Sequence, residues 1–238
     1  MIRMKIAFAL RMINDFSGRW IKEKGFSFYI GERCVHPVEK EEGLYIFLEP
    51  QETETRVMIE SPGYYPCSVL IEKRMLNPQE PIVEVRLYEK AGKQFAPGVG
   101  LLSGRIQAKK QFPVEVYAKK SSTVSVTFKE YRNIEGEHWI WFSGFTKENL
   151  LGKTWLIDDA KNPLLVILQE KRGINEYRAE IISGEPEKIR SGTTVSRIYR
   201  SVTDRQGAYA IPVESGEENK IFEVKILHEN KKFKREGD

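Results

Sequence analysis

The feature that most constrains this chain is a succession of turn, strand and corner signals: Gly43-Leu44-Tyr45-Ile46-Phe47-Leu48, Val57-Met58-Ile59-Glu60 and Ser61-Pro62-Gly63-Tyr64-Tyr65. A glycine turn followed by a continuous apolar run predicts a buried strand, and the Pro-Gly pair predicts a corner. Similar short runs with period-two alternation recur along the chain between Gly, Pro, Asn and Asp residues. The sequence therefore predicts an all-β fold built from antiparallel sheets.

The length of 238 residues favours two domains, since domains cluster at roughly 100–150 residues. Alternation is lost over residues 91–100, which are rich in Gly and Pro and are predicted to be a linker. We expect two antiparallel β-sandwich domains in tandem, over residues 1–90 and, in a diverged form, 101–229. Residues 230–238 form a charged tail that we expect to be frayed.

Within residues 3–90, three motifs occur in order: Asp15-Phe16-Ser17-Gly18, Glu42-Gly43-Leu44-Tyr45-Ile46-Phe47-Leu48 and Val57-Met58-Ile59-Glu60-Ser61-Pro62-Gly63-Tyr64. This pattern resembles the carboxypeptidase-regulatory-like, transthyretin-like sandwich, with Trp20 where a proline is usual and Glu42 where an aspartate is usual. The resemblance implies that the two β-sandwich domains are prealbumin/Ig-like. The resemblance implies a non-catalytic domain that mediates binding or assembly. Asp204-x-x-Gly207-x-Tyr209 echoes Gly43-x-Tyr45, which suggests a diverged second copy of the same hairpin.

No catalytic or metal-binding constellation is evident in the sequence. His36, His138 and His228 lack the short spacings of zinc sites, and no G-x-S-x-G elbow occurs. Asp158-Asp159 has no calcium-loop glycines around it and is interpreted as a turn. The histidine-rich pocket and the C-terminal Tyr-Arg-Gly-Ser of transthyretin-like hydrolases are also absent. We therefore expect no enzyme activity, no metal and no cofactor; a hydrolase would require His138 to gather carboxylates around it.

Charge and composition limit the binding partners and the cellular compartment that we expect for this protein. The net charge of +4 and the scattered Lys and Arg residues fall short of a nucleic-acid footprint, so nucleic acid is not an expected partner. The apolar run Ile6–Leu10 is too short for a signal peptide, and no apolar stretch is long enough to cross a membrane. A cytoplasmic protein, or one carried in a released particle, is expected. The pairing of Cys34 with Cys67 stays open.

Four aromatic residues are the candidate interaction residues. Tyr64 at the Pro-Gly corner is expected to anchor the turn through a hydrogen bond from its hydroxyl group to the backbone, as tyrosines do in other sandwiches. Tyr65 is the first candidate for a partner contact. In Trp139-Ile140-Trp141-Phe142, period two places both tryptophans on one face of a strand and the other two side chains on the opposite face.

These features predict a non-enzymatic binding or assembly module that docks onto a larger bacterial protein complex. By fold-level analogy, an accessory component of a phage-tail-like or contractile injection particle is the expected setting. Sheet edges and Pro-Gly loops would provide the contacts. The alternative is a carbohydrate-binding module in which exposed Trp139 and Trp141, with Trp155, stack on sugar rings.

Overall fold

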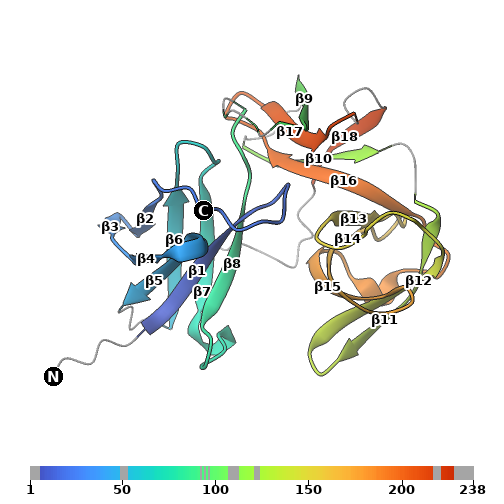
Figure 1. The fold of residues 1–238 in the computed structure, drawn as a ribbon, viewed down its shortest axis with the longest axis horizontal. Coiled ribbons are helices and arrows are strands. Elements are labelled where there is room, and N and C mark those ends of the chain that lie inside the picture. The colour runs from blue at the N-terminus through green and yellow to red at the C-terminus, as the bar shows by residue number, and fades with distance from the viewer. Residues whose placement is uncertain are drawn as a thin grey trace. The chain divides into compact units, whose positions relative to one another are not determined.

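A computed structural model of the chain describes residues 6–48, 53–91, 93, 95, 97–106, 113–120, 124–216 and 221–227, without the side chain of residue 42. The predicted all-β class is confirmed, because antiparallel sheets dominate and the only helical segments among these residues are three single 3-10 turns (Figure 1). The chain divides into two compact units, Met1–Phe95 and Ala96–Asp238.

The described part of the first unit forms two four-stranded sheets, ordered β4-β5-β1-β8 and β3-β2-β6-β7. Its strands are β1 (Ile6–Asn14), β2 (Ser27–Ile30), β3 (Arg33–Val35), β4 (Val38–Lys40), β5 (Leu44–Leu48), β6 (Glu54–Glu60), β7 (Cys67–Glu72) and β8 (Ile82–Leu87). The 3-10 turns η1 (Glu41–Gly43) and η2 (Lys73–Met75) precede β5 and follow β7. β8 pairs with β1 in parallel, and every other pair is antiparallel.

The core of the first unit lies between these two sheets. It contains Phe8, Leu10 and Met12 of β1 together with Tyr45 and Phe47 of β5. The Phe8 and Phe47 rings stack with their centroids 4.7 Å apart. Period-two alternation sends the aromatic residues of β5 inward and leaves its leucines and isoleucine on the outward face.

The two cysteines are free thiols at opposite edges of one sheet. Cys34 lies on β3 and Cys67 on β7, and the strands between them are β2 and β6. Three strand spacings of about 4.8 Å separate them by about 14 Å, well beyond the reach of a disulfide. Cys34 and Cys67 therefore do not form a disulfide bond, which settles the question that the sequence leaves open.

The described part of the second unit is built from an eight-stranded sheet, ordered β11-β12-β15-β14-β13-β16-β10-β18, and the pair β17-β9. Its elements are β9 (Val99–Arg105), β10 (Glu115–Lys120), β11 (Val126–Ile134), β12 (Glu137–Gly144), β13 (Thr154–Ile157), β14 (Leu164–Gly173), β15 (Glu176–Ser183), η3 (Pro186–Lys188), β16 (Val195–Val202), β17 (Ala208–Glu214) and β18 (Phe222–Ile226).

Six strands of this sheet curl until the first meets the last, as Figure 1 shows for β11 to β15. Phe128 N–H donates to the Thr193 carbonyl at 2.8 Å and Gly192 N–H donates to the Phe128 carbonyl at 2.7 Å, joining β11 to the start of β16. Three register shifts between β14 and β15 mark bulges, which increase strand curvature. The result is a closed ring of strands around one apolar interior, in which β11 is no longer a free sheet edge.

The interior of this ring is filled by large side chains. Trp155 is fully buried and its indole N–H donates to the Leu150 carbonyl at 2.9 Å. The run Leu164–Leu168 is buried along its whole length, as expected for a central strand. Ile140 and Phe142 also face this interior, which confirms the predicted alternation of β12.

Three local expectations are corrected or untested. In the sequence, Thr146-x-x-Asn149 loosely imitates a capping box and predicts one helical turn over Thr146–Leu151. No such turn forms, because the side chains of Thr146 and Asn149 instead accept hydrogen bonds from backbone N–H groups two residues on. Val99 and Gly100 belong to β9, since they pair with β17, so the regular structure of the second unit begins inside the predicted linker. The predicted tail, residues 230–238, lies outside the described residues.

Candidate interaction surfaces

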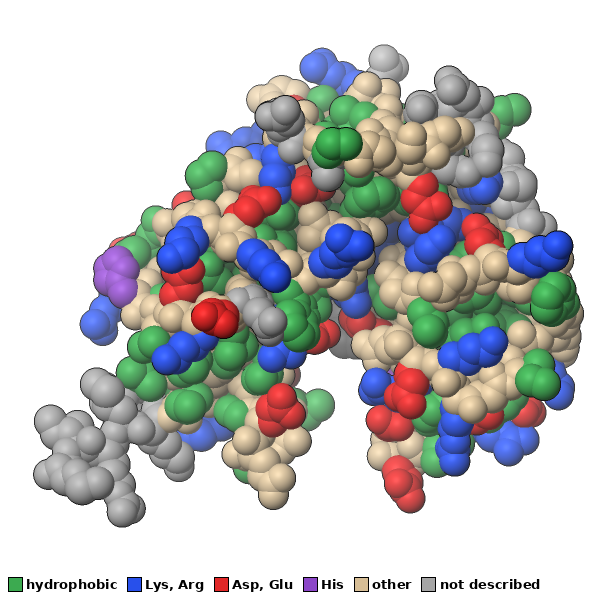
Figure 2. All heavy atoms as spheres, in the orientation of Figure 1, with side chains coloured by type: hydrophobic (Ala, Val, Ile, Leu, Met, Phe, Trp, Pro, Cys, Tyr) green, Lys and Arg blue, Asp and Glu red, His purple; other side chains and the backbone are tan. Residues whose placement is uncertain are grey.

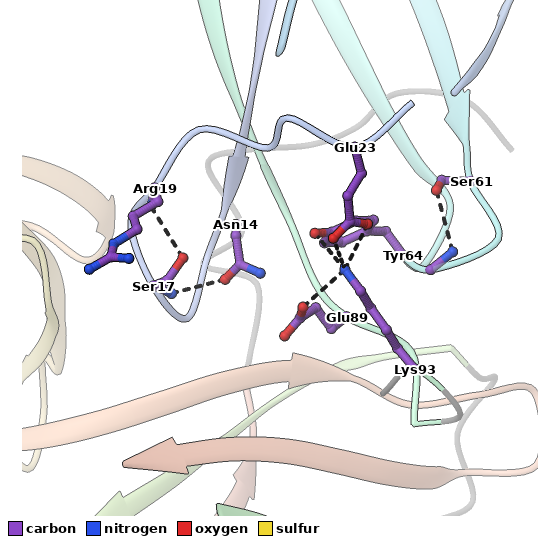
Figure 3. A network of polar contacts seen from close by, with 9 residues as sticks. Asn14, Ser17, Arg19, Glu23, Ser61, Tyr64, Glu89 and Lys93 are labelled. Carbon is purple, nitrogen blue, oxygen red and sulfur yellow. Dashed lines mark hydrogen bonds and ion pairs between the residues drawn. The ribbon is translucent and has the colours of Figure 1, made fainter. Parts of the chain in front are cut away.

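The Pro-Gly corner of the first unit is held by a lysine (Figure 3). Lys93 Nζ donates to the Tyr64 hydroxyl at 2.8 Å and contacts carboxylate oxygens of Glu23 at 2.9 Å and Glu89 at 3.2 Å. Burial opposes the charge on Lys93, but the hydrogen bonds that Lys93 donates to Tyr64, Glu23 and Glu89 outweigh it and raise the pKa of this amine. The Tyr64 hydroxyl thus binds the side chain of Lys93, where the sequence predicts a bond to the backbone.

This network removes Tyr64 from the candidate contact residues. Its side chain is buried in the core of the first unit. Tyr65 is half-buried, and its backbone N–H donates to the Tyr88 carbonyl at 2.8 Å. The corner is thus a structural feature, and Tyr65 keeps a partly accessible surface.

The tryptophans of β12 lie on the outer side of the strand ring, but neither has a fully exposed indole ring. Trp139 is 5% exposed, and the Arg172 guanidinium lies 5.5 Å from the centroid of its ring. Trp141 is half-buried, with Arg132 5.3 Å from its ring centroid. Trp155 is in the core. Stacking on sugars needs open indole faces, so this arrangement does not offer the platform that the carbohydrate-binding alternative requires.

Two exposed apolar side chains lie on neighbouring loops of the second unit and were missed by sequence reasoning. Phe145, just after β12, is 74% exposed, and Ile174, at the tip of the β14–β15 hairpin, is 92% exposed. Each is a single apolar residue among turn residues, in Ser-Gly-Phe-Thr and Gly-Ile-Asn. The signal that could have found them is this isolation of a large apolar side chain within a turn.

Asn175 fastens the two loops to each other. Its side-chain amide donates to the Gly144 carbonyl at 2.6 Å, and its own carbonyl accepts from Phe142 N–H at 2.9 Å. Asn175 has a φ of 58°, a left-handed conformation that asparagine tolerates better than most residues. The pair Phe145 and Ile174, which we call the apolar tip, is therefore presented by loops of fixed geometry.

The remaining sequence candidates do not come together as a catalytic or metal site. In the part of the chain that the structure describes, no group of three His, Cys, Asp or Glu side chains is placed to hold a metal ion. His138 Nδ1 lies 2.8 Å from the Tyr131 hydroxyl, His36 is exposed in the other unit, and His228 lies outside the described residues. Asp159 Oδ1 accepts from the backbone N–H of Lys161, as expected for a turn.

An open depression of about 630 Å³ in the first unit has Tyr45 in its wall. The other residues around it are mainly alternating lysines and glutamates: Lys22, Glu23, Lys24, Glu39, Lys40, Glu41 and Gly43. Burial and, secondly, the nearby carboxylate of Glu39 raise the pKa of Tyr45 to about 12. Tyr45 is thus neutral at physiological pH and unsuited to act as a base.

This pKa predicts an alkaline loss of stability. The folded chain holds the Tyr45 proton more tightly than the unfolded chain, whose tyrosines titrate near pH 10. The stabilisation is therefore complete below about pH 10 and declines as the pH rises toward 12. We expect Tyr45→Phe to flatten the pH dependence of urea unfolding in this range, with the remaining slope coming in part from Lys93. An unchanged slope in the variant would refute the assignment.

No family model, curated protein or solved structure matches this chain. The resemblance of residues 3–90 to the carboxypeptidase-regulatory-like sandwich accordingly stays a prediction. Among the described residues, the structure contains no helix of the length and apolarity needed to cross a membrane.

Proposed function

We propose that this protein is a non-enzymatic binding module that docks onto a larger bacterial protein assembly. The observation that carries the proposal is the apolar tip, Phe145 and Ile174, exposed to 74% and 92% on two loops that Asn175 fastens together. Single exposed apolar residues are common on protein surfaces, but two large ones on loops that are joined to each other can be engaged by the same partner. Apolar side chains carried by fixed loop backbones are suited to fill an apolar pocket of a partner.

The architecture supports this role. The loops that carry the apolar tip connect strands of the closed ring, whose interior is filled and whose strands are fixed on both sides. Rigid scaffolds that present loops are a common design for recognition. The finer proposal, an accessory component of a phage-tail-like or contractile injection particle, rests on the resemblance of residues 3–90 and on analogy at the level of fold.

The test is capture from native lysate with matched variants. Tagged wild-type chain is expected to retain one protein species in constant ratio. The double variant Phe145→Ser, Ile174→Ser is expected to retain at least about tenfold less of that protein, because truncating a buried hot-spot side chain costs about 2 kcal/mol or more of binding free energy. Met75→Ser is the matched control, because Met75 is 77% exposed and lies in the first unit.

The outcomes separate the coarse proposal from the finer one. Equal capture by wild type and the double variant would refute the apolar tip as the binding site. A tail-sheath or baseplate protein identified by mass spectrometry would support the injection-particle setting. Tip-dependent capture of a protein from an unrelated assembly would keep the binding module and remove that setting.

A further inference from the structure

The outward face of the sheet β4-β5-β1-β8 carries an apolar row that crosses all four strands. Val38 of β4 pairs with Ile46 of β5, Ile46 pairs with Ala9 of β1, and Ala9 pairs with Ile82 of β8. Paired residues point to the same side of a sheet. Since Tyr45 and its neighbours in the core occupy the inward side, this row faces away from the core.

This face is unusual for the outside of a sandwich. The outward residues of β5 are all apolar: Leu44, Ile46 and Leu48. On β6 of the other sheet, by contrast, Met58 is the one apolar residue among the four outward positions, and the other three are charged. Val38 is 42% exposed, and Ile6, which pairs with Leu48, is 49% exposed. Figure 2 shows hydrophobic side chains gathered over β1, β4 and β5. A strand that is apolar on both sides is expected where both faces are covered.

We propose that this face, which we call the outer apolar sheet, is covered by the same face of a second copy of the chain. The two sheets would stack at the usual separation of about 10 Å, around a twofold axis that runs parallel to the strands between them. Such an axis places β4 over β8 of the second copy and β5 over β1 of the second copy. The contact is isologous, so each pairing occurs twice.

The apolar row is self-complementary in this arrangement. Val38 lies over Ile82 of the second copy, and Ile46 lies over Ala9 of the second copy. A large side chain therefore meets a small one at the centre of the face, where interdigitation is needed for dense packing. Ala9 is the smallest residue of the row, so the Ile46 side chain meets the least side-chain volume at this position.

Charge selects the direction of the axis. The next outward row is Lys40, Leu44, Arg11 and Glu84, which pair in that order across the four strands. The axis along the strands brings exposed Lys40 at one edge over exposed Glu84 of the second copy, twice. An axis across the strands would stack β4 on β4 and β8 on β8, so these opposite charges would not meet. Complementary rim charges set orientation more than affinity.

The size of the face sets the expected affinity. Four strands at a spacing of about 4.8 Å span about 19 Å, which places the interface at the small end of specific protein contacts. We expect a dimer with a dissociation constant in the micromolar range. The inference does not depend on the proposed function, which rests on Phe145 and Ile174 of the other unit.

Sedimentation velocity of the full chain, at concentrations from about 1 to 200 μM, tests this proposal. Wild type is expected to shift from monomer to dimer across this range. Lys40→Glu and Glu84→Lys are each expected to weaken the dimer about tenfold, and the double charge reversal is expected to return it to within about threefold of wild type. Both residues are exposed, so these variants are expected to fold normally.

Two further variants complete the design. Ile46→Glu places a charge at the centre of the outer apolar sheet and is expected to abolish dimerisation, while Arg56→Glu, on the outward face of the other sheet, is expected to leave it unchanged. A monomer at every concentration overturns the proposal and assigns the face to another occupant. The proposal is also overturned if the charge reversals leave the dissociation constant of the dimer unchanged, or if Arg56→Glu disrupts the dimer.

Discussion

Replacing Gly43 with alanine is expected to destabilise the first unit by roughly 2–5 kcal/mol, although it adds a single methyl group. Gly43 has a φ of 67°, in the left-handed region, and a Cβ atom there would fall 2.2 Å from the Ile21 carbonyl oxygen. The left-handed conformation costs alanine about 1–2 kcal/mol. The clash with a backbone atom adds about 1–3 kcal/mol more, because Ile21 is buried in the core and cannot move freely.

Gly31→Ala is the matched control, because Gly31 has a φ of 58° and open space where the Cβ would lie. This variant is expected to lose about 1–2 kcal/mol, from backbone strain alone. Hydrogen exchange of peptides from β5 and β14 separates the two units in the intact chain. Equal losses in both variants would show that the Ile21 contact is not what makes Gly43 necessary.

Trp155→Ala is expected to be the most damaging core substitution in the second unit, at about 3–5 kcal/mol. The side chain is fully buried at the centre of the strand ring, so its removal leaves a large cavity. It also leaves the Leu150 carbonyl without the indole N–H that reaches it at 2.9 Å. Closed strands on every side limit how far the ring can collapse into the space.

Trp155→Phe distinguishes these two causes. It fills most of the cavity and loses the hydrogen bond, so we expect a smaller cost of roughly 1–2 kcal/mol. Pulse proteolysis in urea follows the fragments of each unit separately, and the first unit should be unaffected. A cost for the phenylalanine variant as large as that for alanine would contradict the account of the cavity.

The sequence predicts the strands and their inward faces well, because alternation is a local signal. Tyr45 and Phe47 point inward on β5 as their period requires, and Ile140 and Phe142 do so on β12. The echo of Gly43-x-Tyr45 at Gly207-x-Tyr209 is less informative. Tyr45 lies in the core of the first unit. The ring of Tyr209 instead packs against the backbone of Gly104, in the space that a Cβ atom on Gly104 would occupy. A shared turn motif does not fix what the tyrosine packs against.

What could not be predicted depends on residues far apart in the chain. Trp139 is buried partly because Arg172, from another strand, covers its ring. The closing of β11 onto the start of β16 depends on bulges and on hydrogen bonds across 65 positions, from Phe128 to Thr193. The two residues of the apolar tip belong to no periodic pattern in the sequence. Phe145 and Ile174 lie on neighbouring loops only because β12 pairs with β15.

Photo-crosslinking from position 174 tests the central claim, binding through the apolar tip, most directly. A photoreactive phenylalanine analogue replaces Ile174 in one chain and Met75 in another, and both chains are irradiated in native lysate. Both positions are highly exposed, at 92% and 77%, so reactivity with solvent is matched. The account predicts one dominant cross-linked protein from position 174 and none from position 75. The same products from both positions, or none from position 174, would contradict it.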